Sequence, residues 1–385
     1  MNPEPNKNNQ KLVMGNEAVA MGAIAAGCDF FAGYPITPAT EILEEMSKML
    51  PPRGGVFLQM EDELSAIAAV IGAAWGGSIS MTATSGPGFS LMQENLGYAS
   101  ITQTPCVVVD CQRGGPSTGL PKLASQGDVM QARFGSHGDR PTLVITASSV
   151  NDCYESTVFA FKMSQKHRMP VILLIDGVIG HIREPVELPP APPPRKATFP
   201  KIDADSPRFG DAPFVPFGHG PVTVVTGLAH QSNGLAETQK GSHTEQMIRT
   251  TIENICRDPE IIDSWALKYQ LDDADVAIVA YGITARSARE AADLLRADGI
   301  KAGLLDLKIL WPFPNEILRE LAGKVAAIIV PELNLGQMVL PLKAAVGGRV
   351  VVHSLNRADG TLLTPNDIAE FAAKQLNSIE ERTHA

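Results

Sequence analysis

The sequence predicts an α/β protein with two domains, each built on a parallel sheet, and three observations support this fold class. Apolar runs that end in turn residues alternate along the chain with longer stretches of helical character. These runs are apolar throughout, as expected for strands that are covered on both faces. A proline-rich stretch, PPAPPP at 189–194, interrupts the alternation, which resumes at about residue 274.

The first domain is predicted to span residues 12–189 and to be a doubly wound parallel sheet. Its expected strands are Phe30–Pro35, Val56–Met60, Ile79–Ser85, Cys106–Cys111, Thr142–Ser148 and Val171–Gly177. Its expected helices are Asn16–Ala26, Thr40–Leu50, Ser65–Trp75 and Asp152–Lys166.

Residues 190–264 are predicted to be an extended linker and a long excursion that packs on the first domain or on a partner, with a flexible linker as the alternative. A second, smaller parallel α/β domain is expected at 265–380. Its expected strands are Val276–Tyr281, Gly303–Leu310, Ala326–Val330 and Val350–Ser354. Its expected helices are Ser287–Ala297, Asn315–Leu321, Gln337–Ala344 and Pro365–Leu376.

Composition excludes several classes of function. The 385 residues carry a formal net charge of −10, which argues against binding a nucleic-acid backbone. The longest apolar stretch, Ala66–Gly77, is too short to cross a membrane, so no membrane association is expected. Met1–Lys11 is polar and lacks the apolar core of a signal peptide, so we expect a frayed tail and a cytoplasmic protein.

The five cysteines are scattered and do not form the closely spaced run that iron–sulfur clusters use. We therefore expect buried free thiols and no metal site in this chain. The cysteines are Cys28, Cys106, Cys111, Cys153 and Cys256.

Loops that follow the predicted strands carry the candidate functional residues, because ligands of open parallel sheets bind beyond the carboxyl ends of the strands. The first loop is YPITPAT at Tyr34–Thr40, in which two prolines stiffen the turn and Thr37 offers a hydroxyl group. The alternative is that Thr37 or Thr40 only caps the following helix.

The second candidate is Glu63, which begins a helix rich in small residues. Acidic residues suit the first turn of any helix, and this accounts for Glu61 and Asp62. The small residues that follow Glu63 at spacings of three, nine and eleven are Ala66, Gly72 and Ala74. This pattern resembles the pyrimidine-binding domains of thiamine diphosphate enzymes, in which a Glu hydrogen-bonds the aminopyrimidine ring of the cofactor.

The third candidate is the glycine-rich segment QRGGPSTGLP at Gln112–Pro121. Arg113 presents a planar guanidinium suited to a carboxylate, and the alternative is a surface arginine on a turn. A fourth segment, TSGPG at Thr84–Gly88, could form a phosphate-binding nest, although no Gly-Lys-Ser/Thr follows it as in a P-loop.

Six motifs in order resemble the α subunits of 2-oxoacid:ferredoxin oxidoreductases, over about residues 20–376. They are YPITPAT, TATSGPGFSLM (82–92), QRGGPSTGLP, TGLAH (226–230), LDLKILWPFP (305–314) and PELNLGQM (331–338). The resemblance implies a pyrimidine-binding domain of the thiamine-enzyme type followed by a domain like the carboxyl-terminal domain of transketolase. It is specific for the family and much less so for the substrate.

The resemblance also implies a division of labour and a set of roles. A β subunit would hold the diphosphate of thiamine diphosphate, Mg²⁺ and a [4Fe-4S] cluster. Glu63 would activate the cofactor, while Thr37 and Arg113 would hold the 2-oxo-carboxylate end of the substrate. The residues expected to contact the cofactor beside Glu63 are Tyr34, Pro35, Ile36, Ser85 and Gly86.

The implied reaction converts 2-oxoglutarate, coenzyme A and oxidised ferredoxin reversibly into succinyl-CoA, carbon dioxide and reduced ferredoxin. We expect a dimer of αβ pairs, and no fused γ-type domain. The second carboxylate of 2-oxoglutarate needs further donors, for which Ser117, Thr118 and Lys122 are the candidates. The alternative for Lys122 is a solvated loop lysine.

Three other functions remain open at this stage. The substrate could be pyruvate or a branched 2-oxoacid, or the chain could be half of a ferredoxin-independent thiamine decarboxylase. It could also be a non-catalytic scaffolding subunit, which the presence of Thr37, Glu63 and Arg113 argues against.

Overall fold

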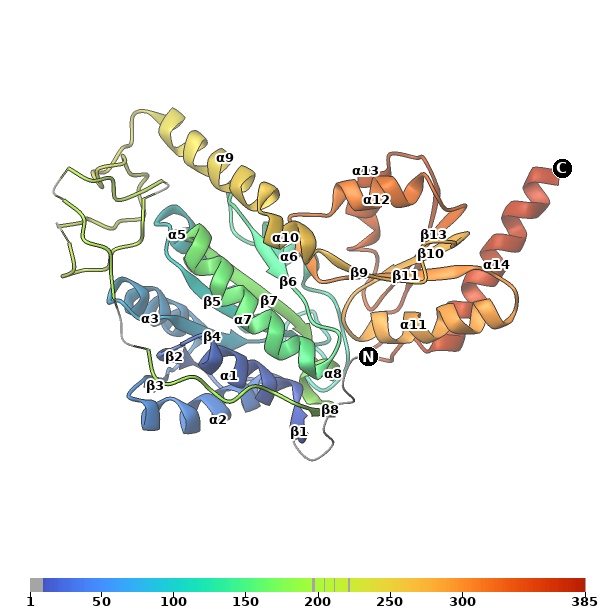
Figure 1. The fold of residues 1–385 in the computed structure, drawn as a ribbon, viewed down its shortest axis with the longest axis horizontal. Helices are drawn as coiled ribbons and strands as arrows, with labels where there is room; N and C mark the ends of the chain where they lie inside the picture. Colours follow the sequence, from blue (N-terminus) through green and yellow to red (C-terminus); the bar gives the residue numbers. More distant parts are fainter. Residues whose placement is uncertain (1–9, 196–197, 204, 211, 221, 385) are drawn as a thin grey trace, which may run out of the picture.

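The computed structural model describes residues 10–195, 198–203, 205–210, 212–220 and 222–384 and contains two main sheets beside each other (Figure 1). The larger sheet has seven strands in the order β12-β6-β7-β5-β4-β2-β3. They are β2 (Phe30–Gly33), β3 (Val56–Gln59), β4 (Ser80–Thr84), β5 (Cys106–Gln112), β6 (Leu143–Ile145), β7 (Pro170–Asp176) and β12 (Ile309–Trp311). Neighbouring strands run parallel except β12, which pairs antiparallel with β6.

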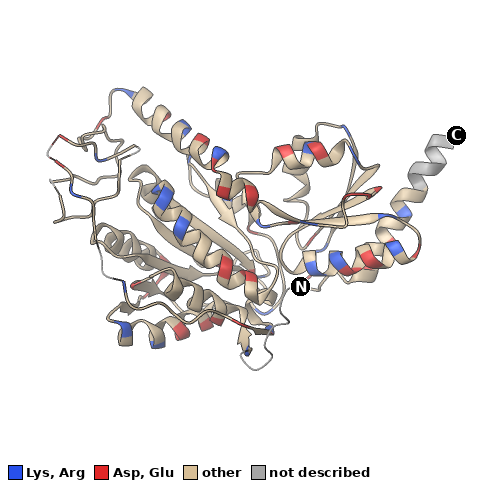
Figure 2. Ribbon diagram, viewed as in Figure 1, with Lys and Arg blue, Asp and Glu red and all other residues tan. Residues whose placement is uncertain are grey.

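Helices cover both faces of this sheet, as predicted. One face is covered by α1 (Gly15–Ala25), α2 (Thr40–Met49), α7 (Val150–His167) and α8 (Gly177–His181). The other is covered by α3 (Glu63–Trp75), α4 (Gly86–Leu91), α5 (Gln93–Ile101) and α6 (Val129–Phe134). The strands are largely neutral and the charged residues gather on outer helices such as α2, α7 and α11 (Figure 2). The predicted strands and helices of this region agree with the structure to within three residues at each end.

The smaller sheet has the order β14-β13-β10-β11-β9. Its strands are β9 (Ala266–Tyr269), β10 (Val276–Ala280), β11 (Ala302–Leu307), β13 (Ala327–Glu332) and β14 (Val351–Asn356). Helices α11 (Gly282–Ala297) and α14 (Pro365–His384) cover one face, while α12 (Asn315–Ala322) and α13 (Val339–Val346) cover the other. The smaller sheet is parallel as predicted except at one edge, where β9 pairs antiparallel with β11.

The predicted strand Gly303–Leu310 was wrong in a way that matters for the whole molecule. The chain leaves the smaller sheet at Leu307 and enters the larger one at Ile309, with Lys308 alone between the two strands. Both halves of the run are apolar, so its composition does not say that they belong to different sheets. As a result one apolar core continues from α3 and α5 into the smaller sheet.

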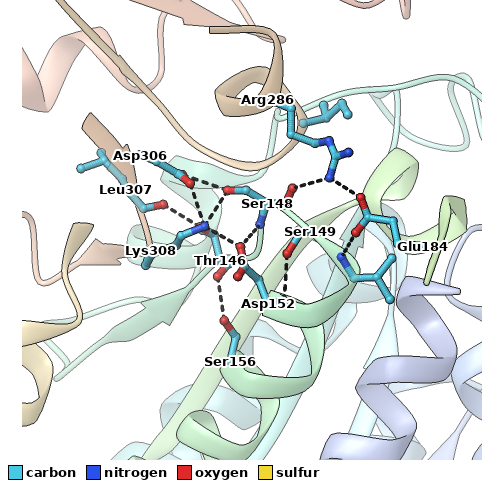
Figure 3. A network of polar contacts seen from close by, with 12 residues as sticks. Thr146, Ser148, Ser149, Asp152, Ser156, Glu184, Arg286, Asp306, Leu307 and Lys308 are labelled. Atoms are coloured by element: carbon cyan, nitrogen blue, oxygen red, sulfur yellow. Dashed lines mark hydrogen bonds and ion pairs between the residues drawn. The ribbon is translucent and has the colours of Figure 1, made fainter. Parts of the chain in front are cut away.

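A polar network fixes this connection between the sheets (Figure 3). Lys308 Nζ lies 2.6 Å from Asp152 Oδ2 and 2.7 Å from Asp306 Oδ2, and it donates to Ser148 Oγ at 3.0 Å. Ser148 Oγ in turn donates to Asp306 Oδ1 at 2.9 Å. Beside it, Arg286 bridges the Glu184 carboxylate and the Ser148 carbonyl oxygen. Each charge in this cluster has an opposite charge or a donor, as buried ions require.

The excursion packs against helix α3, as expected for a segment that packs on the first domain. Phe209, Phe214 and Phe217 surround the Trp75 ring at centroid distances of 6.3, 4.8 and 5.3 Å. Two helices in the excursion were not predicted, α9 (Gly241–Arg257) and the short α10 (Pro259–Asp263). A two-stranded sheet of β1 (Lys11–Met14) and β8 (Arg183–Val186) was also missed. Lys11 therefore belongs to a strand, whereas residues 1–9 of the expected tail lie outside the described residues.

Four of the five cysteines are buried and Cys256 is half-buried, and all five, which lie in the described ranges, are free thiols. In the described part of the chain, no helix has the length and apolar character needed to cross a membrane. No group of three or more His, Cys, Asp or Glu side chains is arranged to hold a metal ion among the described residues.

Candidate active site

The candidate residues meet at the carboxyl ends of β2, β4 and β5. These strands are close together in the larger sheet, where β4 lies between β5 and β2. The loops that leave them contain Thr37, Ser85 and Arg113 respectively. This is the edge at which open parallel sheets bind ligands.

Glu63 begins α3 and is only 5% exposed. The preceding Asp62 caps the helix, because its carboxylate accepts the Ser65 N–H at 2.7 Å. Gly88 of α4 packs directly against Glu63, and a methyl group at Gly88 would collide with the Glu63 carboxylate and the Thr84 hydroxyl. The helix-dipole explanation thus suits Asp62, while Glu63 is a carboxylate enclosed by the protein.

Arg113 is 7% exposed, so the alternative of a surface arginine is wrong. Nη1 donates to the Thr37 carbonyl oxygen at 2.6 Å and Nη2 to the Thr118 carbonyl oxygen at 3.3 Å. Nε finds no partner among the described residues. Burial lowers the pKa of Arg113, while the charges of Asp110, Glu63 and Asp128 act to raise it. The guanidinium therefore joins two of the predicted loops and keeps donors for a ligand.

The loop around Thr37 has the exposed character expected of a ligand-facing turn. Tyr34, Pro35 and Thr37 are exposed and Ile36 is partly buried. Helix α2 begins at Thr40, and in the described region no side chain caps its N-terminus. The alternative in which Thr37 or Thr40 serves only as a helix cap is therefore wrong.

A pocket of about 630 Å³ lies between the two sheets beside Arg113. The larger sheet contributes Gly86, Arg113, Ser117 and Asp128 to its wall. The segment after β13 contributes Leu333, Asn334, Leu335 and Gln337. Asn334 Nδ2 donates to the Gln126 carbonyl oxygen at 2.7 Å and Gln337 Oε1 accepts the Met130 N–H at 2.9 Å, which fixes this second wall.

Lys122 does not share this pocket. It is exposed and lines a neighbouring pocket of about 470 Å³ together with Thr37, Pro38 and His181. Ser117 lines the larger pocket, and the Thr118 carbonyl oxygen holds Arg113. The structure thus brings Thr37, Thr118 and Arg113 together and places Lys122 in a different pocket from Ser117.

Residues that the sequence did not single out complete the site. Asp110 is fully buried at the end of β5, and its carboxylate accepts the Gly86 N–H at 3.2 Å. This hydrogen bond already uses the Gly86 N–H that a phosphate nest would offer. Asp128, Gln126, Asn334 and Gln337 were also missed. Asn334 and Gln337 lie in PELNLGQM, a motif that was noted without being assigned to the site.

Two family models match consecutive parts of the chain. Residues 21–250 match the family described as pyruvate flavodoxin/ferredoxin oxidoreductase, thiamine diphosphate-binding. Residues 274–368 match the pyruvate:ferredoxin oxidoreductase core domain II. The chain belongs to the 2-oxoacid:ferredoxin oxidoreductase family. The resemblance noted in the sequence is thereby confirmed, and the chain contains a thiamine diphosphate-binding domain of this family.

Relatives of known name are similar over nearly their full length. The 2-oxoglutarate synthase subunit KorA of Methanothermobacter marburgensis is 44% identical over 93% of this chain and 96% of its own. The subunit of the same name in Methanocaldococcus jannaschii is 42% identical over 93% of this chain and 98% of its own. The ketoisovalerate oxidoreductase subunit VorB of M. marburgensis is 38% identical over 93% of this chain and 96% of its own.

Two solved structures match the fold. The 2-oxoglutarate:ferredoxin oxidoreductase of Magnetococcus marinus, solved with 2-oxoglutarate, coenzyme A and succinyl-CoA bound, has a TM-score of 0.87 and 33% identity. The match covers 95% of this chain and 65% of that one, so this chain spans about two thirds of its length. A split-gene transketolase, an inactive β4 tetramer, has a TM-score of 0.59 over 95% of this chain and 99% of its own, at 15% identity, and shares the fold alone.

The residues around Glu63 fit the cofactor of this family. The hydroxyl groups of Thr84 and Ser85 are fully buried and have no hydrogen-bond partner in the part of the chain that the structure describes. Buried polar atoms normally find partners, so atoms left over beside an enclosed carboxylate are suited to a polar ligand. There is no room for a side chain at Gly88, because a Cβ there would collide with the Glu63 carboxylate and the Thr84 hydroxyl.

Proposed function

We propose that this chain is the α subunit of a 2-oxoglutarate:ferredoxin oxidoreductase and that it supplies half of the active site. The observation that carries the proposal is the enclosed Glu63 together with the buried Arg113, whose Nε has no partner among the described residues, in a chain 44% identical to a 2-oxoglutarate synthase subunit. The reaction converts 2-oxoglutarate, coenzyme A and two oxidised ferredoxins into succinyl-CoA, carbon dioxide, two reduced ferredoxins and a proton.

Thiamine diphosphate, when bound, supplies the electron sink that makes decarboxylation of a 2-oxoacid possible. Glu63 would hold the aminopyrimidine ring through a hydrogen bond and shift its protonation toward the reactive tautomer. Tyr34, Pro35, Ile36, Ser85 and Gly86 would line the same end of the cofactor. The low exposure of Glu63 strengthens its hydrogen bond, because water does not compete for the carboxylate.

Arg113 and Thr37 would hold the carboxylate and oxo group of the substrate. The guanidinium is fixed by two carbonyl oxygens, so it is oriented before the substrate arrives. Ser117, Thr118 and Lys122 remain the candidates for the second carboxylate of 2-oxoglutarate. Ser117 is in the same pocket as Arg113, whereas Lys122 would have to reach the ligand from the neighbouring pocket.

The remaining components belong to the partners in this proposal. A β subunit would hold the diphosphate, Mg²⁺ and a [4Fe-4S] cluster, and two αβ pairs would form the enzyme. Ferredoxin would carry the electrons away, and coenzyme A would accept the succinyl group. Support comes from the relatives, which are named as one subunit each of an oxidoreductase or synthase.

Oxidation of a branched 2-oxoacid is the second candidate, because a ketoisovalerate oxidoreductase subunit is 38% identical to this chain. Purified complex with its partner subunit should reduce a viologen dye in the presence of coenzyme A and 2-oxoglutarate. Pyruvate and 2-oxoisovalerate are the comparison substrates. A preference for either of them would replace the proposed substrate, and no dye reduction with any 2-oxoacid would overturn the proposed activity.

The chain expressed without a partner should bind thiamine diphosphate poorly, because the proposal places the diphosphate and Mg²⁺ sites in the β subunit. Calorimetry of the isolated chain with thiamine diphosphate and Mg²⁺ measures this directly. Tight, magnesium-dependent binding would contradict the two-subunit site.

A further inference from the structure

Two carboxyl groups meet behind the pocket that contains Arg113. Asp110, at the end of β5, is fully buried, and Asp128 lines the pocket just before α6. The two side chains lie within hydrogen-bonding reach of each other. One oxygen of Asp110 accepts the Gly86 N–H at 3.2 Å, and the backbone N–H of Asp128 donates to Gln112 Oε1 at 3.1 Å.

One oxygen on each carboxyl group has no donor. Neither Asp110 Oδ2 nor Asp128 Oδ2 has a hydrogen-bond partner among the described residues. Two ionised carboxylates in contact would place like charges side by side in a water-poor site and leave both oxygens unsatisfied. A single proton between the two groups turns one of them into a donor and satisfies both.

The environment favours that proton. Burial raises the pKa of Asp110 well above its usual range, and the charge of Asp128 raises it further. Burial also raises the pKa of Asp128, to about 6. The two groups titrate together, so the proton belongs to the pair.

We propose that Asp110 and Asp128 form an acid pair that shares one proton. This proton limits the negative charge beside Arg113, where the carboxylate of the substrate would bind. The inference rests on the proposed function. Gly86 lies between Asp110 and the Arg113 side chain, since its N–H bonds Asp110 and a Cβ at this position would lie 3.9 Å from Arg113 Cγ. Both aspartates therefore act through Arg113 as positioning residues.

The charge balance explains why the proton matters. The negative charges of Asp110, Asp128 and Glu63 all act to raise the pKa of Arg113. If all three carboxyl groups were ionised, one positive charge would face three negative ones, and an anionic substrate would be repelled. Keeping one proton on the pair removes one of those charges.

Other titratable groups pack around the pair, and their effects on the pH dependence must be distinguished from the effect of the pair. Tyr281 at the end of β10 lies against Gln112 and Gln126 and responds to the charge of Asp128. The charges of Asp176 and Glu332 also act on Tyr281, and burial raises the pKa of each of these two carboxyl groups to about 6. Both accept backbone N–H groups, Asp176 from Ile283 and Glu332 from Met338. A pH effect in the wild type alone therefore would not identify the pair.

The Asp128→Asn substitution distinguishes the pH effect of the pair from the pH effects of its neighbours. An asparagine amide is a permanent donor to Asp110 and carries no charge, so it imitates the singly protonated pair at every pH. In wild-type complex with the partner subunit, KM for 2-oxoglutarate should stay low while the pair keeps one proton, and it should rise by up to about tenfold per pH unit only as the pH passes the raised pKa of Asp110. In Asp128→Asn, KM should stay near the wild-type low-pH value, with kcat changed less than KM.

Asp110→Asn is the second variant, because its amide oxygen still accepts from Gly86 while its N–H₂ group donates to Asp128. Asp139→Asn, at an exposed position, is the control and should keep the wild-type pH profile. If Asp128→Asn and Asp110→Asn both follow the wild-type rise in KM, the pair is overturned. The same conclusion holds if both variants lose kcat with unchanged KM.

Melting of the isolated chain tests the proton without any activity. A carboxyl group whose pKa is raised in the folded state stabilises the fold below its unfolded pKa, and this stability is lost as pH rises through the folded pKa. Melting temperature should therefore fall less between acidic and neutral pH in Asp128→Asn than in wild type. Identical falls would overturn the shared proton. If the complex oxidises no 2-oxoacid, the proposed function fails while this measurement still decides the pair.

Discussion

Two polar clusters lie where the sheets of this protein meet, and they differ in how completely their atoms are paired. Around Lys308, two carboxylates and a serine hydroxyl surround one ammonium group (Figure 3). Around Arg113, the guanidinium Nε lacks a partner among the described residues, as do the nearby hydroxyl groups of Thr84 and Ser85. The paired cluster is built to hold the protein together, whereas the unpaired one has atoms available for a ligand.

The largest effect on catalysis is expected at Glu63, which tests whether the unpaired cluster is the active site. If Glu63 holds the cofactor ring as proposed, Glu63→Gln removes the acidic hydrogen bond and should lower kcat by about 10²–10⁴-fold, with an unchanged melting temperature. Glu61→Gln, at an exposed position two residues earlier, is the control. A Glu63→Gln complex that keeps more than half of the wild-type rate would rule out this assignment.

The paired cluster should instead respond in stability. Lys308→Met leaves the carboxylates of Asp152 and Asp306 facing each other without their cation, which should cost about 3–5 kcal/mol of unfolding free energy in urea. Lys162→Met, which removes an exposed ion pair with Glu260, should cost about 1 kcal/mol or less. Equal losses in the two variants would mean that the Lys308 network is not a structural support.

Gly88 tests how closely the active-site wall is fitted. Gly88→Ala places a methyl group against the Glu63 carboxylate and the Thr84 hydroxyl, so Glu63 must move. Displacement of a catalytic group by about 1 Å costs on the order of 10²-fold in kcat/KM. Gly241→Ala, where a Cβ would meet no described atom within 4 Å, is the control. Wild-type kcat/KM in Gly88→Ala would show that the enclosure of Glu63 is not needed.

The smallest effect concerns the extent of the unpaired cluster. If Lys122 reaches the second carboxylate of 2-oxoglutarate, Lys122→Ala should lower kcat/KM for 2-oxoglutarate relative to 2-oxobutyrate by about 10- to 100-fold, since one charged hydrogen bond is worth about 1.5–3 kcal/mol. Arg113→Ala should lower both values together, because Arg113 is proposed to hold the end that the two substrates share. An unchanged ratio in Lys122→Ala would make Lys122 a solvated loop residue, as its exposure suggests.

The sequence predicted most of the fold because its strands are compact apolar runs bounded by turn residues. It failed where the hydrophobic pattern of a segment does not reveal which element that segment packs against. Helix α9 has apolar residues at helical spacing, Ile248, Ile252 and Ile255 among them, but it is polar on average and only Thr251 and Ile255 are buried, so this helix was missed. Strand β12 was hidden in one apolar run with β11, because hydrophobicity predicts burial and not the identity of the neighbouring strand.

Candidate residues that lie next to strand ends could be selected from the sequence, whereas pocket residues contributed by distant parts of the chain were missed. Thr37, Glu63 and Arg113 each stand in a loop or helix start directly after a strand, where the fold class itself directs attention. Asp110 is a single acidic residue inside an apolar strand and forms no spacing pattern with Asp128. Asn334 and Gln337 reach the pocket only because the smaller sheet packs beside the larger one.

The pairing of β12 with β6 also has a consequence for synthesis of the protein on the ribosome. Strand β6 (Leu143–Ile145) cannot receive its antiparallel neighbour until Ile309–Trp311 have been made. A nascent or truncated chain that ends before residue 309 would therefore expose one edge of β6, and exposed strand edges are templates for aggregation. The seven-stranded sheet is thus completed late in translation, and its two parts are poor candidates for separate expression.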